Sequence, residues 1–400
     1  MDKNYIELYS KDGKEGVNIK GQDIVLIDAP EVRLSPATPL LTNAQDVAGA
    51  INELFQLDPG GGEPTEWNPP EHYPTLPESD DYEAHFVLNI ESTEGYNQFL
   101  ITRAPGMDNT DLTFYIDWGD ETDIETFACK SSDSNYNYGT TKSVFKQHTY
   151  TKAGMYVVKI YSVLNPFAIA NFDSGGSTNR HNKIIMANLG DNVHIGKYGN
   201  YSLFYASVND TTLRYVKFSG VFDSENETNI FRNCQALIKV ETRYPFTYIP
   251  AYTFYNCLTL SNVDLSEVTN VQDLAFYNCR SLTKVTMPKC SALGLQVFNG
   301  CSNLKEINLP LCTELNVLDF GSNTSLTTVN IPLCTIINNS VFSSCYNLKE
   351  INMPKCTSVG SLAFNNCFRL SKAVFADNCT FVEGSFNSCS ELYPRPDISI

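Results

Sequence analysis

The C-terminal half of the chain repeats its apolar positions every twenty-two residues. The residues that share this spacing are Phe276, Phe298, Phe320, Phe342, Phe364 and Phe386; Leu260, Leu282, Leu304, Leu326, Leu348, Leu370 and Leu392; and Pro288, Pro310, Pro332 and Pro354. A unit this short cannot bury its apolar side alone, so the pattern predicts coils that stack into a solenoid. Within each coil, the segment Leu-x-x-Val/Ile-x-Leu/Met is expected to form a strand that the following proline ends.

Two stretches show how closely the coils agree, because "VFNGCSNLKEINLPLC" begins at Val297 and "VFSSCYNLKEINMPKC" begins at Val341. In order and spacing, these units resemble leucine-rich repeats of the BspA-like type. The resemblance covers roughly residues 250–392, and looser coils precede it, with Phe231, Cys234 and Leu237 in frame. It implies a curved stack of coils.

The cysteines of the repeat fall on two tracks. One track holds Cys257, Cys279, Cys301, Cys345, Cys367 and Cys389, and the other holds Cys290, Cys312, Cys334 and Cys356. Asn323 fills the one gap in the first track. Zinc motifs need close pairs such as Cys-x-x-Cys, which these spacings do not offer. We therefore predict no metal and no cofactor, and expect reduced, buried thiols that fill the space between coils.

The first 57 residues are predicted to form an attachment and oligomerisation segment. In "LTNAQDVAGAINELFQLD", a helix over 42–57 would carry Val47, Ile51 and Leu54 on one side. This stretch resembles a short element of bacteriophage tail and fibre proteins. A helix of this length needs a partner, so a homo-oligomer is expected, with a trimer as the first choice by analogy with fibres. Residues 58–82, rich in Pro, Gly and acidic residues, are predicted to be a linker.

Residues 83–165 contain short alternating segments separated by turn residues, the pattern of a small β-sandwich. "FYIDWGDE" and "HTYTKAGMYVVKIYSV" resemble the two motifs of the PKD-type fold. The matching residues are Trp118, Gly119, Asp120, His148, Tyr150, Gly154 and Tyr156. The resemblance implies that the two motifs pack against each other. The predicted fold is therefore multi-domain and mainly β, with a PKD-like β-sandwich followed by a leucine-rich-repeat solenoid of about 22-residue coils at 166–400.

Composition narrows the possible partners. A net charge of −17 and the lack of a basic stripe argue against binding to nucleic acid or to anionic membranes. The N-terminus has no apolar signal region, and no later run approaches the ~20 apolar residues of a membrane span, so neither export nor membrane insertion is expected. Proteins and sugars are the remaining partner classes.

The sequence offers little for catalysis, and we predict that the chain is not an enzyme. Its five histidines are scattered, with no nucleophile elbow near them. Acidic residues at 117–123 could gather around calcium, but a solvated turn is the favoured interpretation. Glu306 and Glu350 share a position two coils apart, or about 10 Å at ~4.8 Å per coil, which is slightly beyond the range of glycosidase carboxylates. Because each follows a lysine, a charge-balanced strand face is the better interpretation.

The leading hypothesis is a bacteriophage virion protein, a fibre or tail appendage made in the host cytoplasm, which joins other virion proteins through its N-terminus. Its solenoid would bind a host-surface polysaccharide or protein. The candidate binding residues are Lys284, Thr286, Glu306, Asn308, Asn330, Glu350 and Asn352 on outward strand positions, with Tyr248 and Tyr252 at one end. The alternatives are a non-viral bacterial adhesin, a glycan-degrading spike, and a receptor site on the β-sandwich. Alternatively, the side chains at the outward strand positions could simply be solvated, with the tyrosines packed in the core.

Overall fold

A computed structural model describes residues 7–9, 16–18, 31–32, 69–90, 96–103, 111–129, 137–138, 141–170, 184–195, 197–198, 201–204, 212–222 and 228–393. The chain forms two compact units, Met1–Pro70 and Glu71–Ile400. In the first unit, β1 (Glu7–Tyr9) pairs antiparallel with β2 (Gly16–Asn18) and β3 (Glu31–Val32). The predicted helix with Val47, Ile51 and Leu54 lies outside the described residues. Within them, every regular element is a strand, and no helix could cross a membrane.

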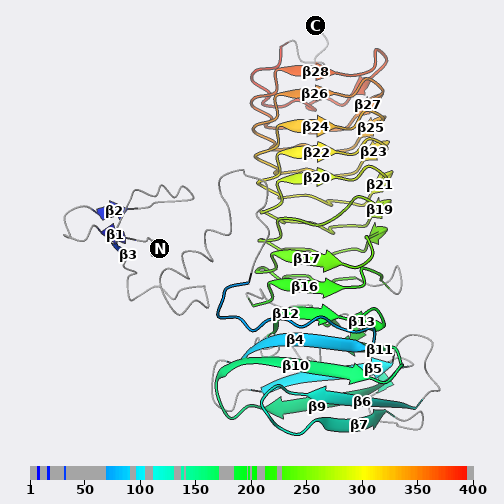
Figure 1. Ribbon diagram of the computed structural model, residues 1–400. Coiled ribbons are helices and arrows are strands. Elements are labelled where there is room, and N and C mark those ends of the chain that lie inside the picture. Colours follow the sequence, from blue (N-terminus) through cyan, green and yellow to red (C-terminus); the bar gives the residue numbers. More distant parts are fainter. Residues whose placement is uncertain are drawn as a thin grey trace. The chain divides into compact units, whose positions relative to one another are not determined.

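Two sheets face each other at the start of the second unit (Figure 1). One contains β4 (Glu83–Ile90), β10 (Gly154–Ser162), β6 (Leu112–Asp117) and β7 (Glu125–Cys129). The other has the order β13 (Val193–Ile195), β11 (Phe167–Ala170), β5 (Tyr96–Arg103), β9 (Thr141–Thr149) and β8 (Asn137–Tyr138). Aromatic rings join the layers, with Phe86 4.9 Å from Phe99 and Phe114 5.4 Å from Phe167. This two-layered β unit occupies the region predicted to be a sandwich.

The first sheet continues without a break into the repeats. β12 (Ile184–Leu189) pairs antiparallel with β4 and parallel with β16 (Tyr215–Phe218), which pairs parallel with β17 (Lys239–Thr242). Strands on both sides of the boundary expected at 165/166 thus share one sheet. β4 pairs with β10 on one side, and its other edge pairs with β12 of the first coil. The two-layered unit thus covers the N-terminal end of the stack.

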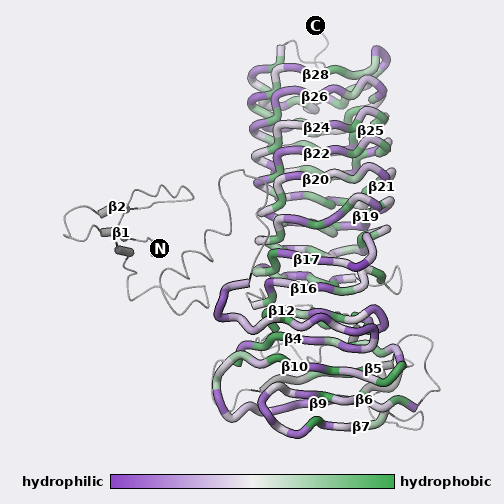
Figure 2. The backbone as a smooth tube through the Cα atoms, viewed as in Figure 1, coloured by the Kyte–Doolittle hydropathy of each residue, from purple (hydrophilic) through white to green (hydrophobic). Residues whose placement is uncertain are grey.

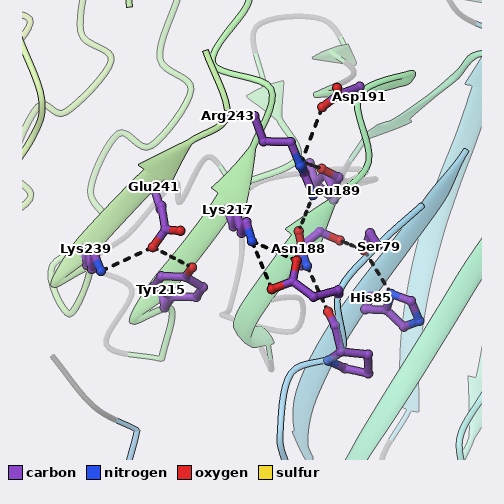
Figure 3. A network of polar contacts seen from close by, with 12 residues as sticks. Ser79, His85, Asn188, Leu189, Asp191, Tyr215, Lys217, Lys239, Glu241 and Arg243 are labelled. Atoms are coloured by element: carbon purple, nitrogen blue, oxygen red, sulfur yellow. Dashed lines mark hydrogen bonds and ion pairs between the residues drawn. The ribbon is translucent and has the colours of Figure 1, made fainter. Parts of the chain in front are cut away.

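Residues 71–82, the end of the predicted linker, form a strap that packs on this sheet (Figure 3). The side-chain amide of Asn188 donates to the Pro77 carbonyl at 2.8 Å, and Glu78 pairs with Lys217 at 2.7 Å. The strap passes so close to Gly190 that a Cβ there would lie 1.9 Å from the Asp80 carbonyl oxygen. This part of the segment predicted to be a linker therefore packs on the sheet, where polar groups hold its backbone and side chains.

Two strand tracks run along the solenoid (Figure 1). One coil contributes only an isolated bridge, at Asn262, to the first track. The first track continues β16 and β17 with β20 (Lys284–Thr286), β22 (Glu306–Asn308), β24 (Thr328–Asn330), β26 (Glu350–Asn352) and β28 (Lys372–Val374). The second holds β18 (Tyr248–Ile249), β19 (Asn270–Val271), β21 (Ala292–Leu293), β23 (Glu314–Leu315), β25 (Ile336–Ile337), β27 (Ser358–Val359) and β29 (Thr380–Phe381). The first track confirms the predicted strands. The second track was not predicted.

Aligned hydrophobic segments form the core of the stack (Figure 2). The repeat phenylalanines stack from Phe276 to Phe386, with ring centroids 5.0 to 5.7 Å apart in successive coils. A short hairpin, β14 (Lys197–Tyr198) and β15 (Tyr201–Ser202), lies among the looser coils. The repeat thus buries one apolar stripe that no single coil could bury alone.

Both cysteine tracks are buried thiols, as predicted. On the first track, each thiol donates to the phenylalanine carbonyl of the preceding coil, as from Cys301 to Phe276 at 3.2 Å and from Cys345 to Phe320 at 3.2 Å. On the second track, each donates to the carbonyl two residues on, as from Cys312 to Glu314 at 3.1 Å. The thiols therefore fill small apolar spaces and also satisfy backbone carbonyls.

Asn323 interrupts the first track and should cost stability. Its side chain is fully buried, and neither its amide nitrogen nor its oxygen has a hydrogen-bond partner among the described residues. We expect Asn323→Cys to raise the free energy of unfolding by about 1–3 kcal/mol, because it removes this desolvated amide and supplies a thiol at the Phe298 carbonyl. Denaturant unfolding measures the change. The control is Asn303→Cys, at an exposed position two residues after Cys301, where the free energy of unfolding should change little. A less stable Asn323→Cys variant would contradict the prediction.

Candidate functional site

The outward face of the first strand track, which we call the strand face, carries two aligned rows of polar side chains. Parallel pairing places Lys284 beside Glu306 and Glu306 beside Thr328. The second row, two residues further along each strand, is Thr286, Asn308, Asn330 and Asn352. Between the rows, Val285, Ile307 and Ile351 point inward and are buried. The structure therefore forms the rows that the sequence predicts, because the strands pair in register at twenty-two residues.

Contacts between coils hold the side chains of these rows. Lys284 pairs with Glu306 at 3.0 Å, and Lys372 pairs with Glu350 at 3.2 Å. These exposed pairs add little stability, but they balance the charges along the first row. In the second row, the Asn330 amide donates to the Asn308 side-chain oxygen at 2.7 Å. The strand face is thus an ordered polar surface without excess charge.

Three predicted binding residues sit differently from the rest. The Thr286 hydroxyl is buried, so it is not presented to a ligand. Tyr248 lies on the second strand track and packs edge-on against Phe222, with ring centroids 5.9 Å apart. Tyr252 lies near the start of the following turn, with the Arg232 guanidinium 5.0 Å from its ring centroid. The structure therefore does not bring the two tyrosines together with the strand-face rows.

Toward the N-terminus, the strand face ends in a dense polar network at the strap (Figure 3). Arg243 donates to the Asn188 side-chain oxygen at 2.8 Å and to the Leu189 carbonyl, and it pairs with Asp191 at 3.5 Å. A hydrogen bond from Lys217 lowers the pKa of Glu78. Local sequence patterns do not reveal this network, although polar residues at outward positions of the looser coils, such as Lys217, are a weak signal for it. Its groups are engaged with one another, so it fastens the strap.

Ser79 and His85 meet in this network without the geometry of a nucleophile and its base. Ser79 Oγ lies 2.9 Å from His85 Nδ1, but it directs its hydroxyl proton to the Asn188 carbonyl oxygen, also at 2.9 Å. Burial lowers the pKa of His85, whose ring is almost wholly covered. The pair therefore serves to hold the strap on β4 and β12.

The two motifs of the two-layered unit pack against each other, as predicted. His148 stacks on Trp118 with centroids 4.9 Å apart and meets Asp120 at 2.7 Å, and the Tyr150 hydroxyl donates to the Trp118 carbonyl at 3.2 Å. Glu121 adopts a φ of +64°, so this position takes the left-handed conformation without a glycine. The carboxylates of this turn accept internal hydrogen bonds, from the Gly119 N–H to Asp117 and from the Thr122 hydroxyl to Asp120. The described part of the chain contains no group of three His, Cys, Asp or Glu side chains that could hold a metal ion.

Comparison with known proteins identifies the repeat. Residues 224–333 and 319–393 match the family described as BspA type Leucine rich repeat region, in six copies. The match covers the stacked coils of the solenoid, which make up less than half of the chain. No curated protein matches the chain.

Similar solved structures include three bacterial repeat proteins. A leucine-rich repeat protein from Bacteroides ovatus is 19% identical, with a TM-score of 0.39 over 52% of this chain and 59% of its own. One from Eubacterium ventriosum is 20% identical, with a TM-score of 0.37 over 46% of this chain and 60% of its own. A leucine rich cell surface protein from Faecalibacterium prausnitzii is 16% identical, with a TM-score of 0.22 over 57% of this chain and 89% of its own. This chain spans about three fifths of the length of the first two.

Proposed function

We propose that this chain is a non-catalytic display protein, whose solenoid binds a polysaccharide or protein on a cell surface through the strand face. The observation that carries the proposal is the register of the strands, which aligns Asn308 with Asn330 and Glu306 with Lys284. Side chains already held in place lose little conformational entropy on binding, which favours recognition of a repeating ligand.

The non-catalytic part of the proposal rests on the carboxylates that a glycan hydrolase would need. Glu306 and Glu350 lie two coils apart, and each is paired with a lysine of a neighbouring coil. The two carboxylates of such an enzyme stand at most about 9.5 Å apart, slightly closer than the ~10 Å expected across two coils. The spacing and the lysine partners therefore favour a charge-balanced strand face over a catalytic pair.

We further propose that the N-terminal segment at 1–57 attaches the chain to a bacteriophage virion as a fibre or tail appendage. Support comes from the likeness of "LTNAQDVAGAINELF" to an element of tail and fibre proteins, and from its apolar residues Val47, Ile51 and Leu54. Oligomerisation through this segment belongs to the same proposal. A bacterial surface adhesin and a glycan-degrading spike are the alternatives.

The two-layered unit belongs to this proposal as a PKD-like spacer between the attachment segment and the solenoid. Its support is the cluster of Trp118, Asp120, His148 and Tyr150. β4 of this unit also pairs with β12 of the first coil. This pairing keeps the end of the stack from pairing with other chains.

Removing the amide row tests the binding surface. We expect the triple variant Asn308→Ala, Asn330→Ala, Asn352→Ala to attach to host cells about tenfold or more weakly, since it removes three sets of exposed donors and acceptors. Its melting temperature should change little, because Asn330 and Asn352 are exposed and Asn308 is half-buried. Labelled full-length chain and flow cytometry measure the attachment. Unchanged attachment by the triple variant would move the receptor site off the strand face.

A further inference from the structure

Each coil has a third side, the turn side, between its second-track strand and the next first-track strand. In the middle coils it comprises residues 294–304, 316–326 and 338–348, followed by Lys305, Thr327 and Lys349 at its border with the strands. Backbone hydrogen bonds tie these turns together, as from Gly300 to the Gly321 carbonyl at 2.9 Å and from Ser322 to the Ser343 carbonyl at 2.7 Å. The turn side is therefore a fixed surface with the pitch of the solenoid.

Exposed charge on this part of the turn side is confined to its border with the strand face, at Lys305 and Lys349. In a chain with a net charge of −17, the three segments 294–304, 316–326 and 338–348 contain one residue from among Asp, Glu, Lys, Arg and His, which is Asp319, and its side chain is fully buried. There, its carboxylate accepts the backbone N–H of Asn316. The exposed positions carry amides, hydroxyls and a few aliphatic side chains. The strand face, by contrast, presents a row of lysines and glutamates.

Aromatic side chains stand at both ends of this uncharged zone. On one side, Tyr277 stacks on Tyr255 with centroids 4.9 Å apart and an angle of 7° between the rings, and the Arg232 guanidinium covers Tyr255 at 4.8 Å. On the other, Tyr346 stacks on Phe368 at 5.3 Å, and these rings are 41% and 43% exposed. The intervening coils have only Asn299 and Gly321 on the track of Tyr277.

We propose that the turn side binds a neutral glycan chain. Sugar rings have apolar C–H faces that pack on aromatic rings, and hydroxyls that exchange hydrogen bonds with amides and hydroxyls. An uncharged ligand needs no counter-charge, and a surface whose middle lacks charges imposes little desolvation penalty for ions. This surface lies apart from the strand face, and its role rests on the display function proposed above.

Affinity electrophoresis tests the proposal with the full-length chain in gels that contain a neutral β-glucan, α-mannan or galactan, and with acidic polygalacturonate as the comparison. We expect retardation by at least one neutral polysaccharide and none by polygalacturonate. The double variant Tyr346→Ala, Phe368→Ala should bind that polysaccharide roughly tenfold more weakly. Its unfolding transition should stay cooperative, since both rings are largely exposed. The matched control is the double variant Ile124→Ala, Leu164→Ala, which removes two exposed apolar side chains from the two-layered unit and should be retarded like the unmodified chain.

Each other outcome overturns the inference in a recognisable way. Attachment of the chain to cells without retardation by any neutral polysaccharide would remove the glycan site and leave the display function standing. Retardation that survives in the Tyr346 and Phe368 variant, or that disappears in the Ile124 and Leu164 control, would place the glycan elsewhere. Failure to bind both cells and polysaccharides would remove the display function together with this site.

Discussion

Replacing Phe364 with alanine is expected to lower the free energy of unfolding by about 3–5 kcal/mol. The ring is fully buried and stacks between Phe342 at 5.3 Å and Phe386 at 5.0 Å, so its removal leaves a cavity that the neighbouring coils cannot close. Since each coil contacts only its neighbours, the loss should also separate the last coils from the rest of the stack. Denaturant unfolding followed by circular dichroism measures the effect.

The same coil supplies the control. Phe368 is the same residue type four positions on, but it is 43% exposed and its main ring contact is Tyr346. Phe368→Ala should therefore cost about 1 kcal/mol. Equal losses from the two substitutions would show that the phenylalanine stack is not what holds the coils together.

Alkaline pH is expected to unfold the solenoid, with the loss of stability beginning near pH 9. Burial raises the pKa of Cys290 to about 11 and those of Cys301, Cys312 and Cys334 to about 12, from an ordinary value of 9.0. The unfolded chain thus releases these protons at lower pH than the folded chain does. The stabilisation is complete below pH 9 and is lost as the pH rises towards 12.

The size of this effect follows from the number of thiols. At pH 11, each thiol with a pKa of about 12 in place of 9.0 favours the unfolded state by about 2–3 kcal/mol. A few such groups approach the total stability of a typical domain, about 5–15 kcal/mol. Circular dichroism against pH should show a cooperative loss of strand signal between pH 9 and 12. Replacing Cys312 and Cys334 with alanine should make the decline shallower, and a folded signal that persists at pH 12 would exclude the buried-thiol ladder.

The repeat could be predicted from sequence because its signals are local and recur many times. The twenty-two-residue spacing of phenylalanine and leucine indicates the coil, and the Leu-x-x-Ile-x-Leu segment indicates its strand. The second strand track escaped prediction because strands such as Ala292–Leu293 have two residues, too few for an alternating pattern. The rows of the strand face were predictable for the same reason as the coil, since register follows directly from a constant repeat length.

The junction could not be predicted, because it depends on contacts between distant parts of the chain. β4 pairs with β12, about a hundred residues later, and no local pattern marks that pairing. Likewise, proline and acidic residues at 71–82 have the composition of a linker, and only the contact of Asn188 with Pro77 and of Lys217 with Glu78 makes them a strap. Tyr248 and Tyr252 were predicted to extend the binding surface at one end, but their separation from the strand face depends on the path of each coil.

Lysine footprinting on the surface to which the chain attaches tests the role of the strand face most directly. Lys284 on the strand face and Lys289 in the turn that follows belong to the same coil, and their side chains are 57% and 53% exposed. The full-length chain is acetylated free and bound to host cells, and the two lysines are compared by mass spectrometry. A strand-face site predicts that binding slows acetylation of Lys284 and of Lys372 while Lys289 reacts as before. Equal reactivity of Lys284 and Lys372 in the free and bound chain, with protection of lysines in the two-layered unit, would contradict it.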